Sequence, residues 1–507
     1  MCRGSPTRRG RASRNGGQGD PEGGLGGASS GGGSGPCPNG RSRRRGPRQM
    51  IKDMRSEQAR RWARAPLILR LAWRNVRNDR LGFAACFVAV LTAVVLVSGN
   101  SLLVAAAAPR SELDGVTGIL ILSAFLSGFV SVFVVGGMLG LHAGRRRRTW
   151  GLLRSIGMTA PQMRRLVLAE ALTLALAASA LGSVLAVPYA KAMAVFLREV
   201  GFAPTDVPVH LSPVPFLLAF VTGPAVMLGA ALGAARRAVR LRPLEVLRET
   251  HVQRGILPMP RLVFGGAVLL GGLWLAVATS RMPVKDAEPA AFGTTLLLCV
   301  GVGSLGPGIL TGLVRMLGPV LIRIDRLPGR LACSALLAAP GRAWAMVSPV
   351  MLTMALACTF LFSVDTEDVW KGFHRTGALA WVAPVMVGSA TVFTVIAVVN
   401  AAAVAMADRG DSLRLLRQVG ALPAQLVRAV CWEVLVATGA GALLGSAIAA
   451  LSLAALGRSM TGEAWFAVSF PQYAGLLATC VAGGLVGALA ATRKARKGPL
   501  LPASAPR

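Results

Sequence analysis

The chain is dominated by a series of apolar runs, each of about the length that crosses a bilayer. A hydrocarbon core of roughly 30 Å is spanned by about 20 apolar residues in a helix. Ten such runs follow residue 65, at 82–107, 117–141, 166–190, 214–235, 262–280, 291–322, 343–364, 378–405, 427–456 and 470–491. Only 15% of the 507 residues are charged, against about 25% in a typical soluble protein. The sequence therefore predicts an all-α polytopic membrane protein with about ten transmembrane helices.

The distribution of positive charge predicts the orientation of these helices. Of the 55 Lys and Arg residues, 47 lie in the N-terminal segment, in alternate loops and at the C-terminus, and 8 lie in the remaining loops. Cytoplasmic segments carry the excess of Lys and Arg, so we expect both termini in the cytoplasm. The net charge of +33 is thereby explained without a nucleic-acid partner. Arg outnumbers Lys among many Ala and Gly residues, which indicates a GC-rich bacterial genome and hence the bacterial plasma membrane.

Residues 1–65 have a different composition, because they are rich in Gly, Arg and Ser and poor in apolar residues. Such a segment cannot fold around a core, so we expect a disordered basic tail. It lacks the apolar centre of a signal peptide. Binding of RNA or anionic lipid by the tail, and translation that starts at Met50 or Met54, remain open alternatives.

A second feature is an internal repeat. Leu152–Gly157 and Leu415–Gly420 both read Leu-Leu-Arg-x-(Ile/Val)-Gly and lie 263 residues apart. The same offset relates further residues: Gln162 and Gln425, Arg165 and Arg428, Glu170 and Glu433, and Leu181-Gly182 and Leu444-Gly445. We therefore divide the chain into the tail, a first four-span repeat at 66–255, a two-span connector at 256–330 and a second four-span repeat at 331–507. The copies begin an even number of spans apart, which predicts a parallel repeat about an axis along the membrane normal. Within the connector, Gly306-Pro307-Gly308 leads us to expect a kink or a break.

The repeated motif follows the second span of each copy and alternates apolar residues with arginine. This pattern predicts short amphipathic helices along the inner membrane face, ended by Gly157 and Gly420. Glu170 and Glu433 come about one turn into the next span, where an ionisable group needs a partner, and Arg165 or Arg428 is the candidate. The loop is either an ordinary basic interfacial loop or a docking element for a cytoplasmic partner, and its duplication favours docking.

The Leu-Leu-Arg-x-Ile-Gly stretch, the Glu that opens the next span and the sequence Arg242-Pro243-Leu244-Glu245-Val246-Leu247-Arg248 together resemble the FtsX-like (MacB-type) permeases of ABC transporters. Two four-span copies joined by two spans are similar to the ten-span, duplicated branch of that family. The resemblance implies that a dimer of separate ABC ATPase subunits binds the two loops as coupling helices. The coupling residues would be Leu152, Leu153, Arg154, Ile156, Gly157, Leu415, Leu416, Arg417, Val419 and Gly420, with Glu170 and Glu433 as interfacial acids.

This sequence departs from the family in two places. The links at Pro109–Val116 and Asp365–Gly377 are too short to hold the extracytoplasmic domain that many members carry, so adaptor binding outside the membrane is not carried over. The second copy ends Gly498-Pro499-Leu500 and lacks the Glu-Val-Leu-Arg continuation.

The sequence contains no pattern for chemistry of its own. None of the six lysines follows a glycine, so the phosphate-binding loop that ends Gly-Lys-(Ser/Thr) is missing. The four histidines are scattered, and cysteines 86, 299, 358 and 480 lie inside apolar runs as small buried hydrophobes. We therefore expect no enzyme activity, no cofactor and no metal site, and ATP hydrolysis by a partner chain.

Three functional hypotheses follow. The first is an ABC transporter permease subunit that exports or extracts a hydrophobic or amphipathic substrate, with membrane lipid as its surroundings. The second is an ATPase-coupled regulatory or signalling protein that acts on a cell-envelope partner without transport. The third, an ion-coupled transporter, predicts ionisable residues near the bilayer centre, and the spans nearly lack them. The identity of the substrate and the direction of transport do not follow from the sequence.

Overall fold

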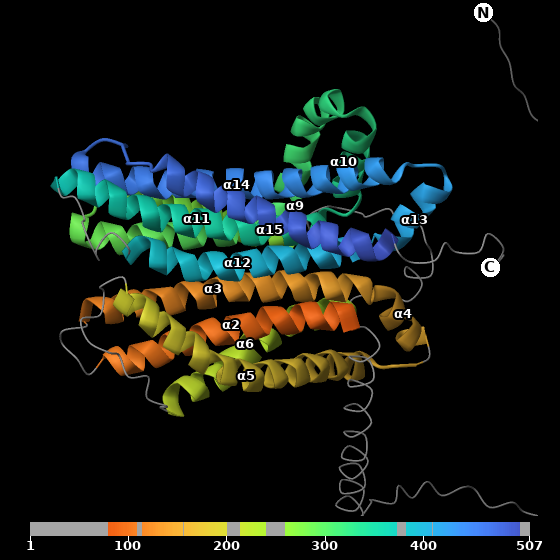
Figure 1. Cartoon of the computed structure of the whole chain (residues 1–507), viewed down its shortest axis with the longest axis horizontal. Coiled ribbons are helices and arrows are strands. Elements are labelled where there is room, and N and C mark those ends of the chain that lie inside the picture. The colour runs from red at the N-terminus through yellow and green to blue at the C-terminus, as the bar shows by residue number, and fades with distance from the viewer. Residues whose placement is uncertain are drawn as a thin grey trace, which may run out of the picture. The chain divides into compact units, whose positions relative to one another are not determined.

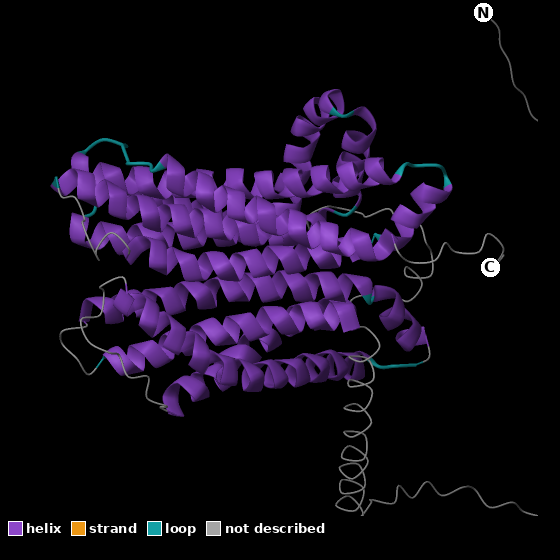
Figure 2. Ribbon diagram, in the orientation of Figure 1, coloured by secondary structure: helices purple, strands orange, loops and turns teal. Residues whose placement is uncertain are grey.

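The computed structural model describes residues 80–108, 114–155, 157–199, 213–239, 259–372, 382–407 and 409–496. These residues are helical apart from short turns (Figures 1 and 2). The helices are α2 (Arg80–Ala107), α3 (Asp114–Arg145), α4 (Arg147–Ser155), α5 (Ala160–Glu199), α6 (Pro213–Val239), α8 (Met259–Thr279), α9 (Val284–Ile324), α10 (Arg326–Ala338), α11 (Pro340–Lys371), α12 (Val382–Ala407), α13 (Gly410–Gln418), α14 (Pro423–Thr461) and α15 (Phe470–Arg496).

Eight of the described helices, namely α2, α5, α6, α8, α9, α11, α14 and α15, are long and apolar enough to cross a membrane. The second and eighth predicted runs lie in α3 and α12, which are 32 and 26 residues long. Their apolar stretches are shorter, at Ser123–Leu139 and Thr394–Met406. The prediction of an all-α polytopic membrane protein is confirmed.

The helices differ in how much of their surface other helices cover. The apolar window of α11 is 100% buried, whereas those of α6 and α8 are 18% and 17% buried. Helix α11 packs against α3, α9, α12 and α14, so it forms the centre of this part of the molecule. The exposed sides of α6 and α8 carry large apolar residues such as Val221 and Trp274, as expected for helices that face the hydrocarbon of a bilayer.

Helix α9 continues through the Gly306-Pro307-Gly308 segment, so of the expected kink or break the structure excludes the break. Pro307 has no N–H for the carbonyl of Gly303. The guanidinium of Arg261 compensates, since it donates to the carbonyl oxygens of Ser304 at 2.5 Å and Gly303 at 3.5 Å. A Cβ on Gly306 would lie 1.9 Å from the Trp344 ring, so glycine is needed here for α11 to pack against α9.

The element order repeats along the chain: α2 to α6 is followed by α8, α9 and α10, and then by α11 to α15. Helix α3 contacts α12, and the cross contacts α3–α11 and α2–α12 are also made. In the repeat, α2 corresponds to α11 and α3 corresponds to α12. The α3–α11 contact is therefore the counterpart of the α2–α12 contact, as in an isologous dimer interface.

The packing of small residues also repeats. A Cβ on Gly182 of α5 would lie 3.4 Å from the Leu91 carbonyl oxygen and 2.7 Å from the Val94 side chain in α2. A Cβ on Gly445 of α14 would lie 2.5 Å from the Met351 carbonyl oxygen and 2.6 Å from Met354 Cβ in α11. Close approach of backbones at small residues is the usual way in which membrane helices associate.

Candidate functional site

The first repeated motif forms a short helix, a glycine turn and the start of a span. Helix α4 is nine residues long and ends before Gly157, whose φ is 101°. The Met158 N–H donates to the Leu153 carbonyl oxygen at 3.0 Å, so the turn satisfies a carbonyl that the end of the helix leaves free. The Gln162 side chain then accepts from the Thr159 N–H at 3.0 Å where α5 begins.

The second motif repeats each of these features. Helix α13 is also nine residues long, and Gly420 has the same φ of 101°. The Ala421 N–H donates to the Leu416 carbonyl oxygen at 3.0 Å, and Gln425 accepts from the Leu422 N–H at 3.1 Å. A positive φ costs non-glycine residues conformational energy, which explains why both turns contain glycine. We call α4 with Gly157 and α13 with Gly420 the two turn units.

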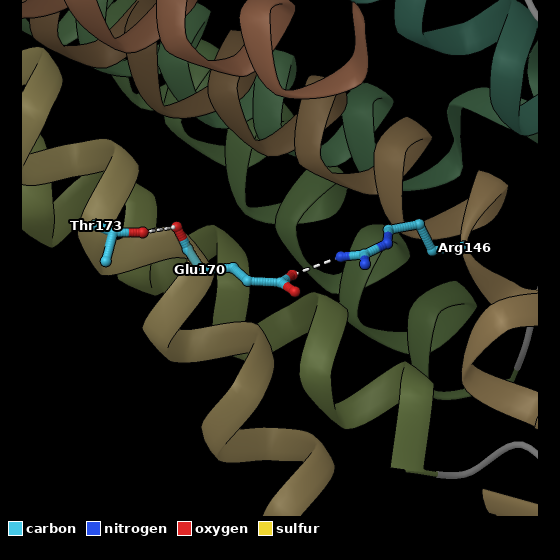
Figure 3. Close-up of polar contacts among 3 residues, drawn as sticks. All are labelled: Arg146, Glu170 and Thr173. Carbon is cyan, nitrogen blue, oxygen red and sulfur yellow. Dashed lines mark hydrogen bonds and ion pairs between the residues drawn. The ribbon is translucent and has the colours of Figure 1, made fainter. Parts of the chain in front are cut away.

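A buried ion pair joins the start of the first turn unit to the following span. Arg146 precedes α4, and its guanidinium donates to Glu170 Oε2 of α5 at 2.6 Å (Figure 3). The two side chains are 8% and 5% exposed. The Arg146 guanidinium also lies 5.6 Å from the Phe83 ring centroid, within the range of a cation–π contact. A charged hydrogen bond of this kind is strong where water is excluded.

The second turn unit has the matching pair. Arg409 precedes α13 and bonds Glu433 of α14, with side chains that are 12% and 3% exposed. Arg342 of α11 adds a second positive charge near Glu433. The offset of 263 residues relates both members of the two pairs, so the repeat extends to individual contacts.

The prediction that Arg165 or Arg428 neutralises these acids is wrong. Each arginine lies five residues before its glutamate, and residues five apart lie on different faces of a helix. Arg428 instead pairs with Asp325 at 3.0 Å, and Arg165 is exposed. The arginines that do pair lie on the N-terminal side of the Leu-Leu-Arg motifs. Arg146 and Arg409 are also 263 residues apart. Extending the comparison of the two copies toward the N-terminus would therefore have identified them from the sequence.

The apolar residues of the turn units point to two different sides. Leu152, Leu415 and Val419 are 49%, 58% and 87% exposed. Leu153 and Leu416 are half-buried, and Leu153 packs against the core. Arg417 is also half-buried. Arg154 lies in α4, and Ile156 lies outside the described residues. Each unit therefore has at least one large apolar side chain that is about half exposed or more.

Both turn units lie at the same end of the spanning helices (Figure 1). This follows from the parallel repeat, because α3 and α12 each lead into a turn unit and contact each other. In the parts of the chain that the structure describes, no group of three or more His, Cys, Asp or Glu residues could hold a metal ion.

Comparison with known proteins finds a family model that matches the segment around the first turn unit. Residues 121–243 match the family model for the FtsX-like permease C-terminal domain. The match spans most of α3 and all of α4, α5 and α6, and so includes Arg146, Glu170 and Gly157. The resemblance seen in the sequence motifs is confirmed over this segment. A search of the curated proteins found no match. The FtsX-like match supports a membrane permease component of an ABC-type system.

Proposed function

We propose that this chain, whose residues 121–243 match the FtsX-like permease domain, is the membrane-spanning subunit of an ABC transporter that separate ATPase subunits drive through α4 and α13. The observation that carries the proposal is the duplication of one turn unit, with the same glycine φ and the same buried ion pair. Two equivalent elements at one end of the spans fit a dimer of identical ATPase subunits.

The exposed apolar residues supply the contact. Leu152 and Leu415 are about half exposed on short helices, and removing such side chains from water on binding is favourable by about 25 cal/mol per Å². A soluble ATPase that covers α4 and α13 would bury them. The basic residues around them suit a partner with acidic groups at its rim.

The two buried ion pairs would transmit movement from the short helices to the spanning helices. Because Arg146 fixes the start of α4 to Glu170 of α5, a displacement of α4 is carried to the span rather than absorbed in the loop. Arg409 and Glu433 do the same for α13 and α14. The two repeats would then move against each other along the reciprocal α2–α12 and α3–α11 contacts.

The short outer links favour a substrate that is reached from the membrane itself. Helix α2 ends at Ala107 and α3 begins at Asp114, and α11 ends at Lys371 before α12 begins at Val382. Neither link has room for a folded domain. We therefore propose export or extraction of a hydrophobic or amphipathic substrate from a bacterial plasma membrane, with both termini in the cytoplasm.

The experiment is co-purification of the ATPase with the tagged full-length chain from native membranes. Leu152→Asp and Leu415→Asp place a carboxylate in the expected apolar contact, and an unpaired buried charge costs several kcal/mol. Each single variant should lose part of the bound ATPase, and the double variant should lose nearly all of it, since about 2.8 kcal/mol is a hundredfold in affinity.

Val468→Asp is the matched control, because Val468 is 55% exposed on the loop at the other end of α14. It should retain the ATPase at the wild-type level. Wild-type recovery of the ATPase by the Leu152→Asp/Leu415→Asp variant, at equal expression, would show that the turn units are not the docking site.

A further inference from the structure

The end of α9 and the whole of α10 form a hairpin that exposes apolar side chains. We call residues 315–338 the α9–α10 arm. Met316, Val320 and Ile324 are 78%, 55% and 66% exposed. They are spaced four residues apart, so they form one stripe along α9. Leu327, which is 47% exposed, follows at the start of α10. A water-facing surface rarely keeps such a continuous apolar stripe.

The same arm carries unpaired positive charge. Arg315, Arg323, Arg326 and Arg330 are exposed, and none of them has a carboxylate partner among the described residues. Asp325 is the only acidic residue between 289 and 364. It is 11% exposed and is already bonded to Arg428 at 3.0 Å and to the Trp432 indole N–H at 3.1 Å.

The arm is held in a fixed position. A Cβ on Gly329 would lie 2.7 Å from the Leu321 carbonyl oxygen, so α10 folds back closely on α9. The Gly329 N–H donates to the Asp325 carbonyl oxygen at 2.8 Å. Through its carboxylate, Asp325 also ties the hairpin to α14. Figure 1 shows α10 to the side of α14, whereas α13 lies at the end of the helices.

We propose that the α9–α10 arm binds the headgroups of anionic phospholipids at the cytoplasmic face of the membrane. Such a lipid offers a phosphate to the arginines and an acyl chain to the stripe of Met316, Val320 and Ile324, so it satisfies both features of this surface at once. Arginine binds phosphate with two parallel hydrogen bonds, and basic groups near an anionic leaflet are attracted to it. Because the stripe continues a membrane-spanning helix, it fits lipid better than a soluble acidic partner.

The test uses the purified full-length chain in nanodiscs of equal parts phosphatidylcholine and phosphatidylglycerol. Native mass spectrometry counts the molecules of each lipid that stay bound. The Arg323→Ala/Arg326→Ala/Arg330→Ala variant should lose its preference for phosphatidylglycerol by about tenfold or more. High salt should weaken the preference of the wild type, because exposed charges are screened. A single Arg330→Gln variant should show a smaller loss in the same direction.

The matched control is the variant Arg281→Ala/Lys285→Ala/Arg458→Ala, which removes three exposed positive charges. These residues lie at the C-terminal ends of α8 and α14 and at the N-terminal end of α9, away from the α9–α10 arm. It should keep the wild-type preference. Met316→Ser/Val320→Ser/Ile324→Ser should retain fewer lipids of both kinds, because the acyl contact is lost.

Three results would overturn the proposal: an unchanged lipid preference in the arm variant with wild-type helix content, an equal loss in the control, or displacement of bound phosphatidylglycerol by inorganic phosphate. The last result would assign the arginines to free anions rather than to lipid.

Discussion

Helices α5 and α14 occupy matched places in the two repeats, and they differ in what holds them. At the end next to the turn units, both bond an arginine that precedes a turn unit. Toward the other end, the Tyr189 hydroxyl of α5 donates to Asn100 at 3.3 Å, and Asn100 donates to Ser123 at 3.2 Å. Ser452 stands at the position of Tyr189 in α14 and accepts from Thr295 of the connector at 2.8 Å. The polar contact of α5 stays within its own repeat, and that of α14 leaves it.

A second difference points the same way. Trp432 of α14 donates to Asp325 of the connector, and the matched residue in α5 is Ala169. The second copy is therefore bonded to the connector at both ends of α14. The connector also covers α11, whose apolar window is fully buried, while that of α2 is 56% buried. The two turn units are alike, whereas the contact with α9 of the connector helps to bury α11 at the centre of the second copy.

The largest expected effect tests whether the two turn units are held equally. Glu170→Ala and Glu433→Ala each leave a guanidinium buried without its carboxylate, which costs about 3–5 kcal/mol. Stability can be measured by denaturant titration in detergent, followed by the loss of helical signal. Lys371→Ala is the control, since its side chain is 54% exposed and its pair with Glu367 contributes about 0.3–0.5 kcal/mol. Losses below about 1 kcal/mol for both glutamates would contradict the view that the pairs fix the turn units.

An intermediate effect is expected at the matched glycines. Gly445→Ala should destabilise more than Gly182→Ala, because its Cβ meets backbone atoms of α11 while that of Gly182 first meets the Val94 side chain. Overpacking of this kind costs about 1–3 kcal/mol. Gly439→Ala on α14 has nothing within 4 Å and should be neutral or stabilising. The same denaturant titration measures the loss of stability of each variant. Equal losses for Gly182→Ala and Gly445→Ala would show that the two helix contacts are equally close.

The smallest expected effect concerns the contact that only one copy contains. Trp432→Phe removes the indole donor to Asp325 but keeps an aromatic ring, so it should cost about 1 kcal/mol. Asp325→Asn keeps an acceptor for Trp432 and loses the charge that faces Arg428, which is 66% exposed, so the ion-pair part of its cost should be below about 1 kcal/mol. Thermal unfolding of Trp432→Phe, Asp325→Ala and their double mutant would measure the coupling, because alanine removes the acceptor that asparagine keeps. Additive losses would mean that Trp432 does not act through Asp325.

The helical elements and the repeat follow from the amino-acid sequence alone. Runs of about 20 apolar residues can only be satisfied as helices in a bilayer, so the order of spans followed from local composition. The Gly157 and Gly420 turns were also predictable, because a left-handed backbone at a helix end favours glycine whatever surrounds it. The constant offset between the copies was enough to match α4 with α13.

Which residues meet depends on how the helices pack against one another. Glu170 and Glu433 bond arginines 24 residues away across a turn, and the rotation of each helix about its axis selects that partner over one five residues away. The same rotation exposes Leu152 and half-buries Leu153. Within α9, Arg261 of α8 bonds the Ser304 carbonyl oxygen, and Gly306 lies against the Trp344 ring of α11. In each case the deciding interaction joins segments distant in the chain, and periodicity within one helix does not specify it.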